Sequence, residues 1–194
     1  MIIYKNRIVV VCGVILMDVL IVSQNFYPDH FTVNELAFGL AEKVHNITVL
    51  TGLPDYQTGH VPKPYRFFRR RREIVHGVRI VHVPVIARRK GLLFRIFNYL
   101  SFFLSSSLYA LFASNRYDRV FSYQTSPVTM AQAAVIMARR ANCPLLLYCL
   151  DLWPESLKAW EVKEKSVLFR LLRRYSGYIY RSCDTIAVSS EPFR

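Results

Sequence analysis

The chain has 194 residues, of which 53% are apolar, and a positive mean hydropathy of +0.20. This composition excludes a disordered polymer and suits one globular domain, or one domain with a short extension. The net charge of +13 is uneven, because eleven basic residues stand against one acid, Glu73, between His60 and Arg95. Such a local excess predicts a polyanionic partner: an anionic lipid surface, a phosphorylated substrate or nucleic acid.

The amino-terminal residues combine charge with an apolar run. Lys5 and Arg7 precede apolar residues 8–16, which resemble the start of a secretion signal, but no small-residue cleavage site follows. We interpret residues 1–16 as a dispensable apolar extension, with the domain proper covering residues 17–194. A signal or an anchor remains the alternative.

Apolar runs and helical spacing alternate along the rest of the chain. Short apolar runs predict strands at residues 19–23, 47–51, 119–123, 145–150 and 185–189. Alternation around His76 and Gly77 predicts a strand pair or one bent strand over residues 73–85. Helical spacing predicts helices over residues 33–44, 91–113, 128–140 and 166–182. Strands alternating with helices predict an α/β fold with a Rossmann-like, doubly wound and mostly parallel sheet.

Two helices carry more detailed expectations. Thr32 and Glu35 stand three residues apart, which predicts a capping box at the start of the helix over residues 33–44. In the last helix, apolar spacing predicts an inward face made of Leu168, Leu171, Leu172, Tyr175 and Ile179.

Ligands of parallel sheets bind beyond the carboxyl ends of the strands. This rule selects the loops at residues 23–33, 51–58, 124–129 and 151–155. The first loop lacks G-x-G-x-x-G, so it carries no dinucleotide fingerprint. The polar residues that these loops contribute are Asn25, Tyr27, Asn34, Gln124, Thr125 and Ser126. The last three suit sugar hydroxyls or a phosphate, although an ordinary helix cap before Pro127 explains them equally well.

Two carboxylates follow the apolar strand at residues 145–150. Asp151 and Glu155 are flanked by Trp153 and Pro154, and a partly desolvated carboxylate at a strand end suits a general base. The alternative is that Asp151 caps a turn and Glu155 is solvated. The four cysteines form no C-x-x-C pair and have no histidine at ligand spacing, so we expect neither a metal site nor a disulfide framework.

Residues 91–113 form an apolar stretch whose single charge is Arg95. As a helix it would be about 34 Å long, enough to cross a bilayer. Burial, interfacial docking and crossing are the three interpretations, and we favour burial of one side with membrane contact on the other. Phe67 and Phe68 beside arginines repeat the pairing of apolar and basic residues. The basic residues expected to contact membrane or phosphate are Arg69, Arg70, Arg71, Arg72, Arg88, Arg89 and Lys90.

Five segments, in order, resemble the N-terminal domain of family 4 glycosyltransferases of the GT-B fold. The resemblance is strongest to enzymes that build capsule, O-antigen and exopolysaccharide repeat units. The segments are residues 19–29, 34–42, 47–56, 123–127 and 151–156. The resemblance implies a two-domain enzyme whose first domain binds the acceptor and whose second binds the nucleotide sugar, without a metal. It also implies a lipid-diphosphate-linked saccharide acceptor at the cytoplasmic membrane face.

The resemblance implies a catalytic or binding role for Asp151, with Glu155 as a weaker candidate, and acceptor binding by the polar loop residues named above. Two departures stand out. His30, Phe31 and Thr32 replace a glycine pair that is common in the wider family, and the donor-binding domain has no counterpart in the sequence. We therefore expect an acceptor-binding domain truncated before its donor domain, inactive without that domain or a separate donor-binding subunit, and with no cofactor of its own.

A non-catalytic, membrane-associated scaffold or remnant that binds lipid-linked sugar or a partner subunit is the alternative function. Nucleic-acid binding through residues 69–72 has no recognition module to support it, and we expect none. The expected location is cytoplasmic and peripheral, at the inner face of the plasma membrane.

Overall fold

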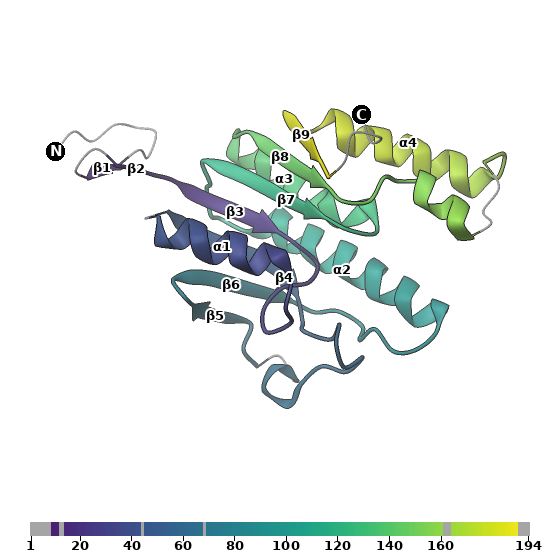
Figure 1. Ribbon diagram of the computed structural model, residues 1–194, viewed down its shortest axis with the longest axis horizontal. Helices are drawn as coiled ribbons and strands as arrows, with labels where there is room; N and C mark the ends of the chain where they lie inside the picture. The colour runs from purple at the N-terminus through teal and green to yellow at the C-terminus, as the bar shows by residue number, and fades with distance from the viewer. Residues whose placement is uncertain (1–8, 12–13, 44, 68, 161–163, 190–194) are drawn as a thin grey trace.

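The computed structural model describes residues 9–11, 14–43, 45–67, 69–160 and 164–189. The chain folds around a seven-stranded sheet with the order β5-β6-β4-β3-β7-β8-β9 (Figure 1). The strands are β3 (Asp18–Val22), β4 (Asn46–Gly52), β5 (Arg72–Val75), β6 (Val78–Val83), β7 (Arg119–Gln124), β8 (Leu145–Cys149) and β9 (Thr185–Val188). All neighbours pair in parallel except β5 and β6. The predicted Rossmann-like, mostly parallel α/β fold is confirmed.

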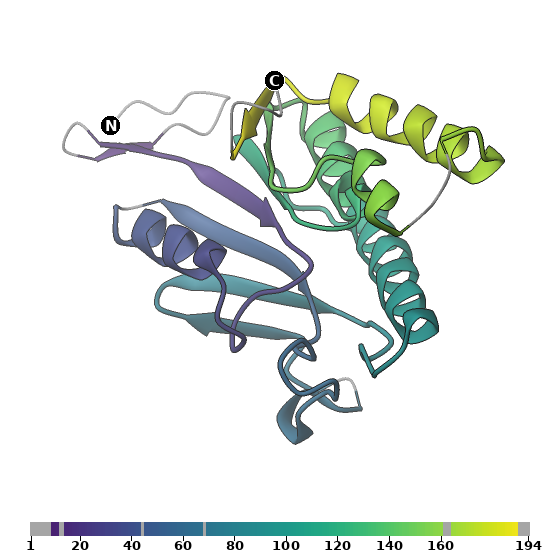
Figure 2. The same cartoon turned by 45° about the vertical axis from the view of Figure 1, so that its right-hand side comes forward.

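Helices cover both faces of the sheet (Figure 2). The α-helices are α1 (Thr32–Glu42), α2 (Leu92–Phe112), α3 (Gln132–Ala141) and α4 (Val167–Arg181), and the 3₁₀ helices are η1 (Lys63–Tyr65), η2 (Val128–Ala131) and η3 (Glu155–Trp160). Helix α1 packs on β4 and β6, whereas α2 and α3 pack on the other face. The helix expected over residues 128–140 is thus divided into η2 and α3.

The two faces of the sheet have separate cores. In β3, Leu20 and Val22 join the core under α2 and α3, whereas Ile21 joins the core under α1. All three side chains are fully buried. A strand covered on both faces has no solvent-facing side, which explains the unbroken apolar run in this part of the sequence.

The expected strand pair around His76 and Gly77 is an antiparallel hairpin of β5 and β6. His76 and Gly77 have φ angles of 47° and 77°. Positive φ at both central positions is typical of a type I′ turn, whose twist matches that of the strands it joins. The hairpin places β5 at the edge of the sheet.

The N-terminal segment contains a second, two-stranded antiparallel sheet of β1 (Val9–Val11) and β2 (Val14–Leu16). It lies at the left end of β3 in Figure 1. Of the expected extension over residues 1–16, residues 1–8, 12 and 13 lie outside the described residues.

The capping box at Thr32 was wrong. Phe31 is the N-cap of α1, with extended backbone angles and no side-chain cap, and Thr32 is already helical. Because a capping side chain must sit on the last non-helical residue, Thr32 cannot fill this role. Its hydroxyl instead lies by the phenol of Tyr123, where its hydrogen bond lowers the pKa that burial raises.

The expected inward face of α4 was partly wrong. Leu168 and Leu171 are 55% and 61% exposed, while the buried residues are Phe169, Ser176 and Ile179. Ser166 caps the helix by accepting a hydrogen bond from the Phe169 amide at 3.1 Å. Since Phe169 and Ile179 both face inward, Leu168 and Leu171 are rotated toward solvent.

Candidate functional site

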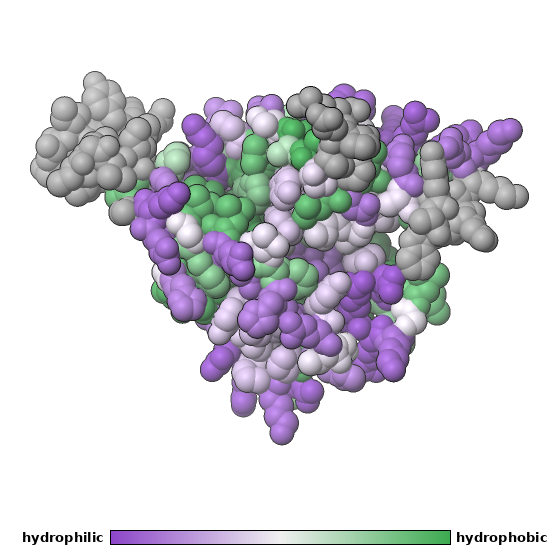
Figure 3. Space-filling model, viewed as in Figure 1, coloured by the Kyte–Doolittle hydropathy of each residue, from purple (hydrophilic) through white to green (hydrophobic). Residues whose placement is uncertain are grey.

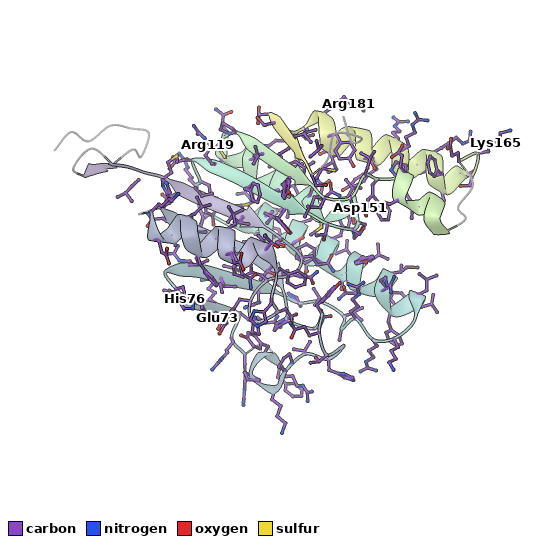
Figure 4. All side chains as sticks on the ribbon, in the orientation of Figure 1. Glu73, His76, Arg119, Asp151, Lys165 and Arg181 are labelled. Atoms are coloured by element: carbon purple, nitrogen blue, oxygen red, sulfur yellow. The ribbon has the colours of Figure 1, made fainter. Side chains whose placement is uncertain are left out.

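The loops after β7 and β8 meet at the carboxyl edge of the sheet. Figure 4 shows Asp151 at this edge and Arg119 at the opposite, amino end of the strands. The Gln124 side-chain amide donates to the Asp151 carbonyl at 2.8 Å, and the Leu150 amide donates to the Gln124 carbonyl at 2.9 Å. These two bonds fix the backbone of the β8 loop against the end of β7.

The Asp151 carboxylate is held through one of its two oxygens. Oδ2 accepts hydrogen bonds from the Ser126 hydroxyl and from Trp153 Nε1, the latter at 2.9 Å. Trp153 Nε1 also donates to the Ser126 oxygen at 3.3 Å, which closes a triangle of three side chains. Both of these bonds use Oδ2, so neither of them occupies Oδ1.

Burial raises the pKa of Asp151 above its ordinary value. The hydrogen bond from Trp153 Nε1, together with the nearby Ser156 side chain, opposes this effect by stabilising the charged form. A half-buried carboxylate with a raised pKa binds a proton more readily than a solvated one does. Its position, partial exposure and orientation therefore suit a general base for a hydroxyl group.

Glu155 is placed differently. It is the first residue of η3, is half-buried, and accepts no hydrogen bond from the side chains of the described residues. Among the described residues, hydrogen bonds thus orient one of the two candidate carboxylates, Asp151.

The polar residues expected to bind a ligand divide into two groups. Ser126 contacts the Asp151 carboxylate, and Gln124, which is fully buried, supports the same loop from behind. Thr125 directs its hydroxyl to the Met130 sulfur at 3.5 Å. These three residues follow one another at the end of β7, so the structure brings this segment and Asp151 together.

The residues expected to bind a ligand in the first loop and at the start of α1 make contacts within that region. The Asn34 amide is buried and donates to the Asp29 carbonyl at 2.7 Å. The Tyr27 ring packs edge-on against Phe38 at 6.4 Å, and the Asn25 carbonyl accepts a bond from the Ser23 hydroxyl at 2.8 Å. No bond between these three residues and Asp151 occurs in the described part of the chain.

A buried polar network on the other half of the carboxyl edge was not anticipated. Asp55, 3% exposed, accepts hydrogen bonds from the Arg88 amide at 2.7 Å and from Asn98 Nδ2 at 2.9 Å. Gln24 Nε2 donates to Asn98 Oδ1 at 2.7 Å. Burial raises the pKa of Asp55 to about 6. The sequence offered one clue, an asparagine inside an otherwise apolar helix.

The comparison with known families decides the identity of this domain. A sequence model of the family described as "Glycosyl transferase 4-like domain" matches residues 30–194. The chain belongs to this family. A search of curated proteins found no match. The matched region includes Asp151, Ser126, Asp55 and Asn98, so these residues of the carboxyl edge lie within the glycosyl transferase 4-like domain, and the match supports a glycosyltransferase-like role.

Helix α2 of this glycosyl transferase 4-like domain buries polar side chains and exposes apolar ones, the reverse of an ordinary surface helix. Its four buried residues include two polar ones, Asn98 and Ser106, beside Phe102 and Ala110. The exposed side chains on its outward face are Leu93, Phe97, Leu100, Leu104, Leu108 and Leu111. The expected burial of one side is confirmed. In the described part of the chain, no helix combines the length and apolarity needed to cross a membrane.

The basic residues of the glycosyl transferase 4-like domain form two groups. Residues 69–72 lie in the loop before β5 and at its start, next to Phe67, which is 91% exposed; Phe68 lies outside the described residues. Residues 88–90 instead lie at the start of α2, beside a cavity of about 540 Å³. Hydrophilic residues gather over the lower edge of the molecule in Figure 3, where the loop between β4 and β5 lies.

A second hollow, of about 520 Å³, lies at the amino edge of the sheet. It is lined by Asp18, Asn46 and Arg79, among others, and so lies at the opposite ends of the strands from Asp151. Parallel sheets bind their ligands at the carboxyl ends, and we therefore assign the site to that edge.

Proposed function

We propose that this domain is the acceptor-binding half of a glycosyltransferase that moves a sugar from a nucleotide sugar to a lipid-linked saccharide in surface polysaccharide synthesis. The nucleotide sugar would be held by a donor-binding domain or by a separate subunit. The observation that carries the proposal is the Asp151 carboxylate, oriented through Oδ2 by Ser126 and Trp153 at the carboxyl edge of a glycosyl transferase 4-like domain.

The proposed step is a substitution at the anomeric carbon of the donor. The acceptor hydroxyl oxygen forms a bond to that carbon, and the nucleoside diphosphate leaves with the electron pair of the broken bond. The hydroxyl proton passes to Oδ1 of Asp151. Ser126 and Trp153 hold the carboxylate in one orientation while the proton is transferred.

Helix α2 supports an acceptor that is embedded in a membrane. Its outward leucines are 49–68% exposed, and basic residues 88–90 precede its first turn. Exposing leucine to water while burying asparagine is unfavourable for a helix in solution. An apolar face beside cations instead suits an anionic bilayer surface. We propose peripheral docking of α2 at the inner face of the plasma membrane.

The transfer step is tested by replacing Asp151 with Asn in the protein supplied with its donor-binding domain or subunit. Removing a general base lowers the rate about 10²–10⁴-fold. We expect this loss for Asp151→Asn and little change for Glu155→Gln, measured as transfer of labelled sugar to a polyprenyl diphosphate saccharide. Unchanged transfer by Asp151→Asn would remove its proposed role. Acceptor binding without transfer, whatever donor partner is supplied, would instead indicate the scaffold.

Docking is tested by vesicle flotation with two matched variants. Leu104 is 63% exposed on α2, and Ile74 is 73% exposed on β5. Because burying a leucine in an apolar phase contributes about 1.5–3 kcal/mol, Leu104→Ser should weaken binding to phosphatidylglycerol vesicles about fivefold or more. Ile74→Ser should bind as the parent protein does. Equal binding by all three proteins would argue against docking through α2.

A further inference from the structure

The cavity at the start of α2 is assembled from two segments that are distant in sequence. The loop after β4 contributes residues 56–60, and the chain entering α2 contributes residues 88–91 and Arg95. Gly59 has a φ of 68°, and a Cβ at this position would lie 3.2 Å from the Arg88 carbonyl oxygen. Glycine therefore allows both the turn and the close approach of the two segments.

Arg88 is fixed at its backbone and at its side chain. Its amide donates to the buried Asp55 carboxylate at 2.7 Å. Its guanidinium lies over the Tyr56 and Tyr99 rings, 4.7 and 5.7 Å from their centroids. No described residue accepts a hydrogen bond from this guanidinium. The rings therefore hold a planar group whose N–H donors are available to an anion.

The charge of the cavity is one-sided. Arg88, Arg89, Lys90 and Arg95 line it, and no aspartate or glutamate does so among the described residues. Asp55 lies behind Arg88 and offsets part of the charge of that one residue. Gly91, the N-cap of α2, has no side chain to cap the first turn, so the positive end of the helix dipole adds to the same field.

The surroundings of the cavity indicate what kind of anion fits. The exposed apolar face of α2 begins next to it, at Leu92 and Leu93. The charges of Arg88, Arg89 and Lys90 and a volume of about 540 Å³ are more than one phosphate group requires. A diphosphate joined to an aliphatic chain would place its charges in the cavity and its chain along α2.

We propose that this cavity binds the diphosphate group of the lipid-linked acceptor, with Arg88 as the central donor. The identity of the lipid rests on the proposed function, whereas the diphosphate site rests on the cavity itself. Arg69 and Arg72 lie outside it. The basic stretch of the sequence thus contains one ligand site and a separate basic segment.

The test is calorimetric titration of the full chain with inorganic pyrophosphate at constant ionic strength. We expect saturable binding at one site, weakened about 10-fold or more by Arg89→Glu/Lys90→Glu, both of which change exposed residues. Arg88→Lys keeps the charge but removes the planar donor group, and should weaken binding several-fold. The matched double variant Arg69→Glu/Arg72→Glu should bind within about twofold of the parent. Absence of saturable binding, or equal weakening by the two double variants, would overturn the proposal.

A competition experiment distinguishes a diphosphate from an ordinary lipid headgroup. Pyrophosphate should displace polyprenyl diphosphate presented in detergent micelles, while inorganic phosphate at the same concentration should not. Displacement by both anions alike would reveal a general anion surface and overturn the assignment. Asp151→Asn should bind pyrophosphate normally, so that failure of sugar transfer with intact binding concerns the proposed function alone.

Discussion

Two aspartates at the carboxyl edge of the sheet show how one physical effect serves two purposes. Burial raises the pKa of both Asp55 and Asp151. Asp55 is 3% exposed and is bonded to a backbone amide and to Asn98, both of which belong to the segment that forms α2 and its entry. Asp151 is half-buried and bonded to Ser126 and Trp153.

The two carboxylates differ in how accessible they are to a ligand. The bonds of Asp55 join the loop after β4 to α2, so this carboxylate fastens two parts of the chain together. The bonds from Ser126 and Trp153 both use Oδ2 of Asp151, so neither of them occupies Oδ1. Buried acids are therefore not equivalent candidates for catalysis, and the following predictions separate the two.

The largest effect on stability is expected at Asn98. Asn98→Ala leaves the Gln24 amide, the Ile86 carbonyl and part of the Asp55 carboxylate without their partners. Buried groups without partners cost about 1–3 kcal/mol each, so we expect the free energy of unfolding to fall by about 2–4 kcal/mol. Urea denaturation measures this change. The exposed Asn115→Ala variant should change the free energy of unfolding by less than about 1 kcal/mol. Equal losses in the two variants would show that the buried hydrogen bonds of Asn98 do not stabilise the fold.

Asp55→Asn should change how stability depends on pH. The pKa of Asp55 is about 6 in the folded state against an ordinary value of 3.8, so the folded chain binds more protons than the unfolded chain between these values. Stability contributed by this group is thus present below about pH 4 and is lost as the pH rises to about 6.

Between about pH 4 and pH 6 the ionisation of Asp55 should lower the free energy of unfolding by about 2–3 kcal/mol at most. Asp55→Asn should abolish this pH dependence. Denaturation at several pH values between 4 and 7 measures the slope. A slope that Asp55→Asn leaves unaltered would contradict a buried, proton-binding Asp55.

A smaller effect is expected at Trp153, this time on the transfer reaction. Trp153→Phe removes the indole N–H that lowers the pKa of Asp151, so that pKa should rise further. Because the base acts in its ionised form, the acid limb of the rate profile should move to higher pH, with about a two- to fivefold loss of rate on that limb. A uniform loss at all pH values would show that the indole acts through packing instead.

The smallest effect is expected for the stability of Asp151→Asn. The amide oxygen can still accept bonds from Ser126 and Trp153, and a neutral group removes the cost of burying a charge. We therefore expect the free energy of unfolding to change by less than about 1 kcal/mol by urea denaturation. A loss as large as that of Asn98→Ala would make Asp151 a structural residue.

The position of Asp151 could be predicted because it depends on local sequence alone. An apolar strand followed by a carboxylate places that carboxylate at the carboxyl edge of any parallel sheet. Its bond to Ser126 joins residues 25 apart, and the bond from Asn98 to Asp55 joins residues 43 apart. Asp151 and Ser126 both lie in loops at the carboxyl ends of strands, where ligands of parallel sheets are expected. Asn98 lies in a helix, which that expectation does not cover.

The sequence by itself determined the alternation of strands and helices, the parallel α/β class and the approximate bounds of the seven-stranded sheet and its α-helices, because periodicity and turn residues act over a few positions. It did not predict β1, β2, η1 or η3. Only the tertiary structure decided which way α2 faces. The apolar residues of a helix that is apolar nearly all round do not specify which side faces the core. The hydrogen bonds of Asn98 to Asp55 and Gln24 therefore set the rotation of α2 about its axis. With that rotation the leucines face outward, and the Arg88 guanidinium lies over the Tyr56 and Tyr99 rings.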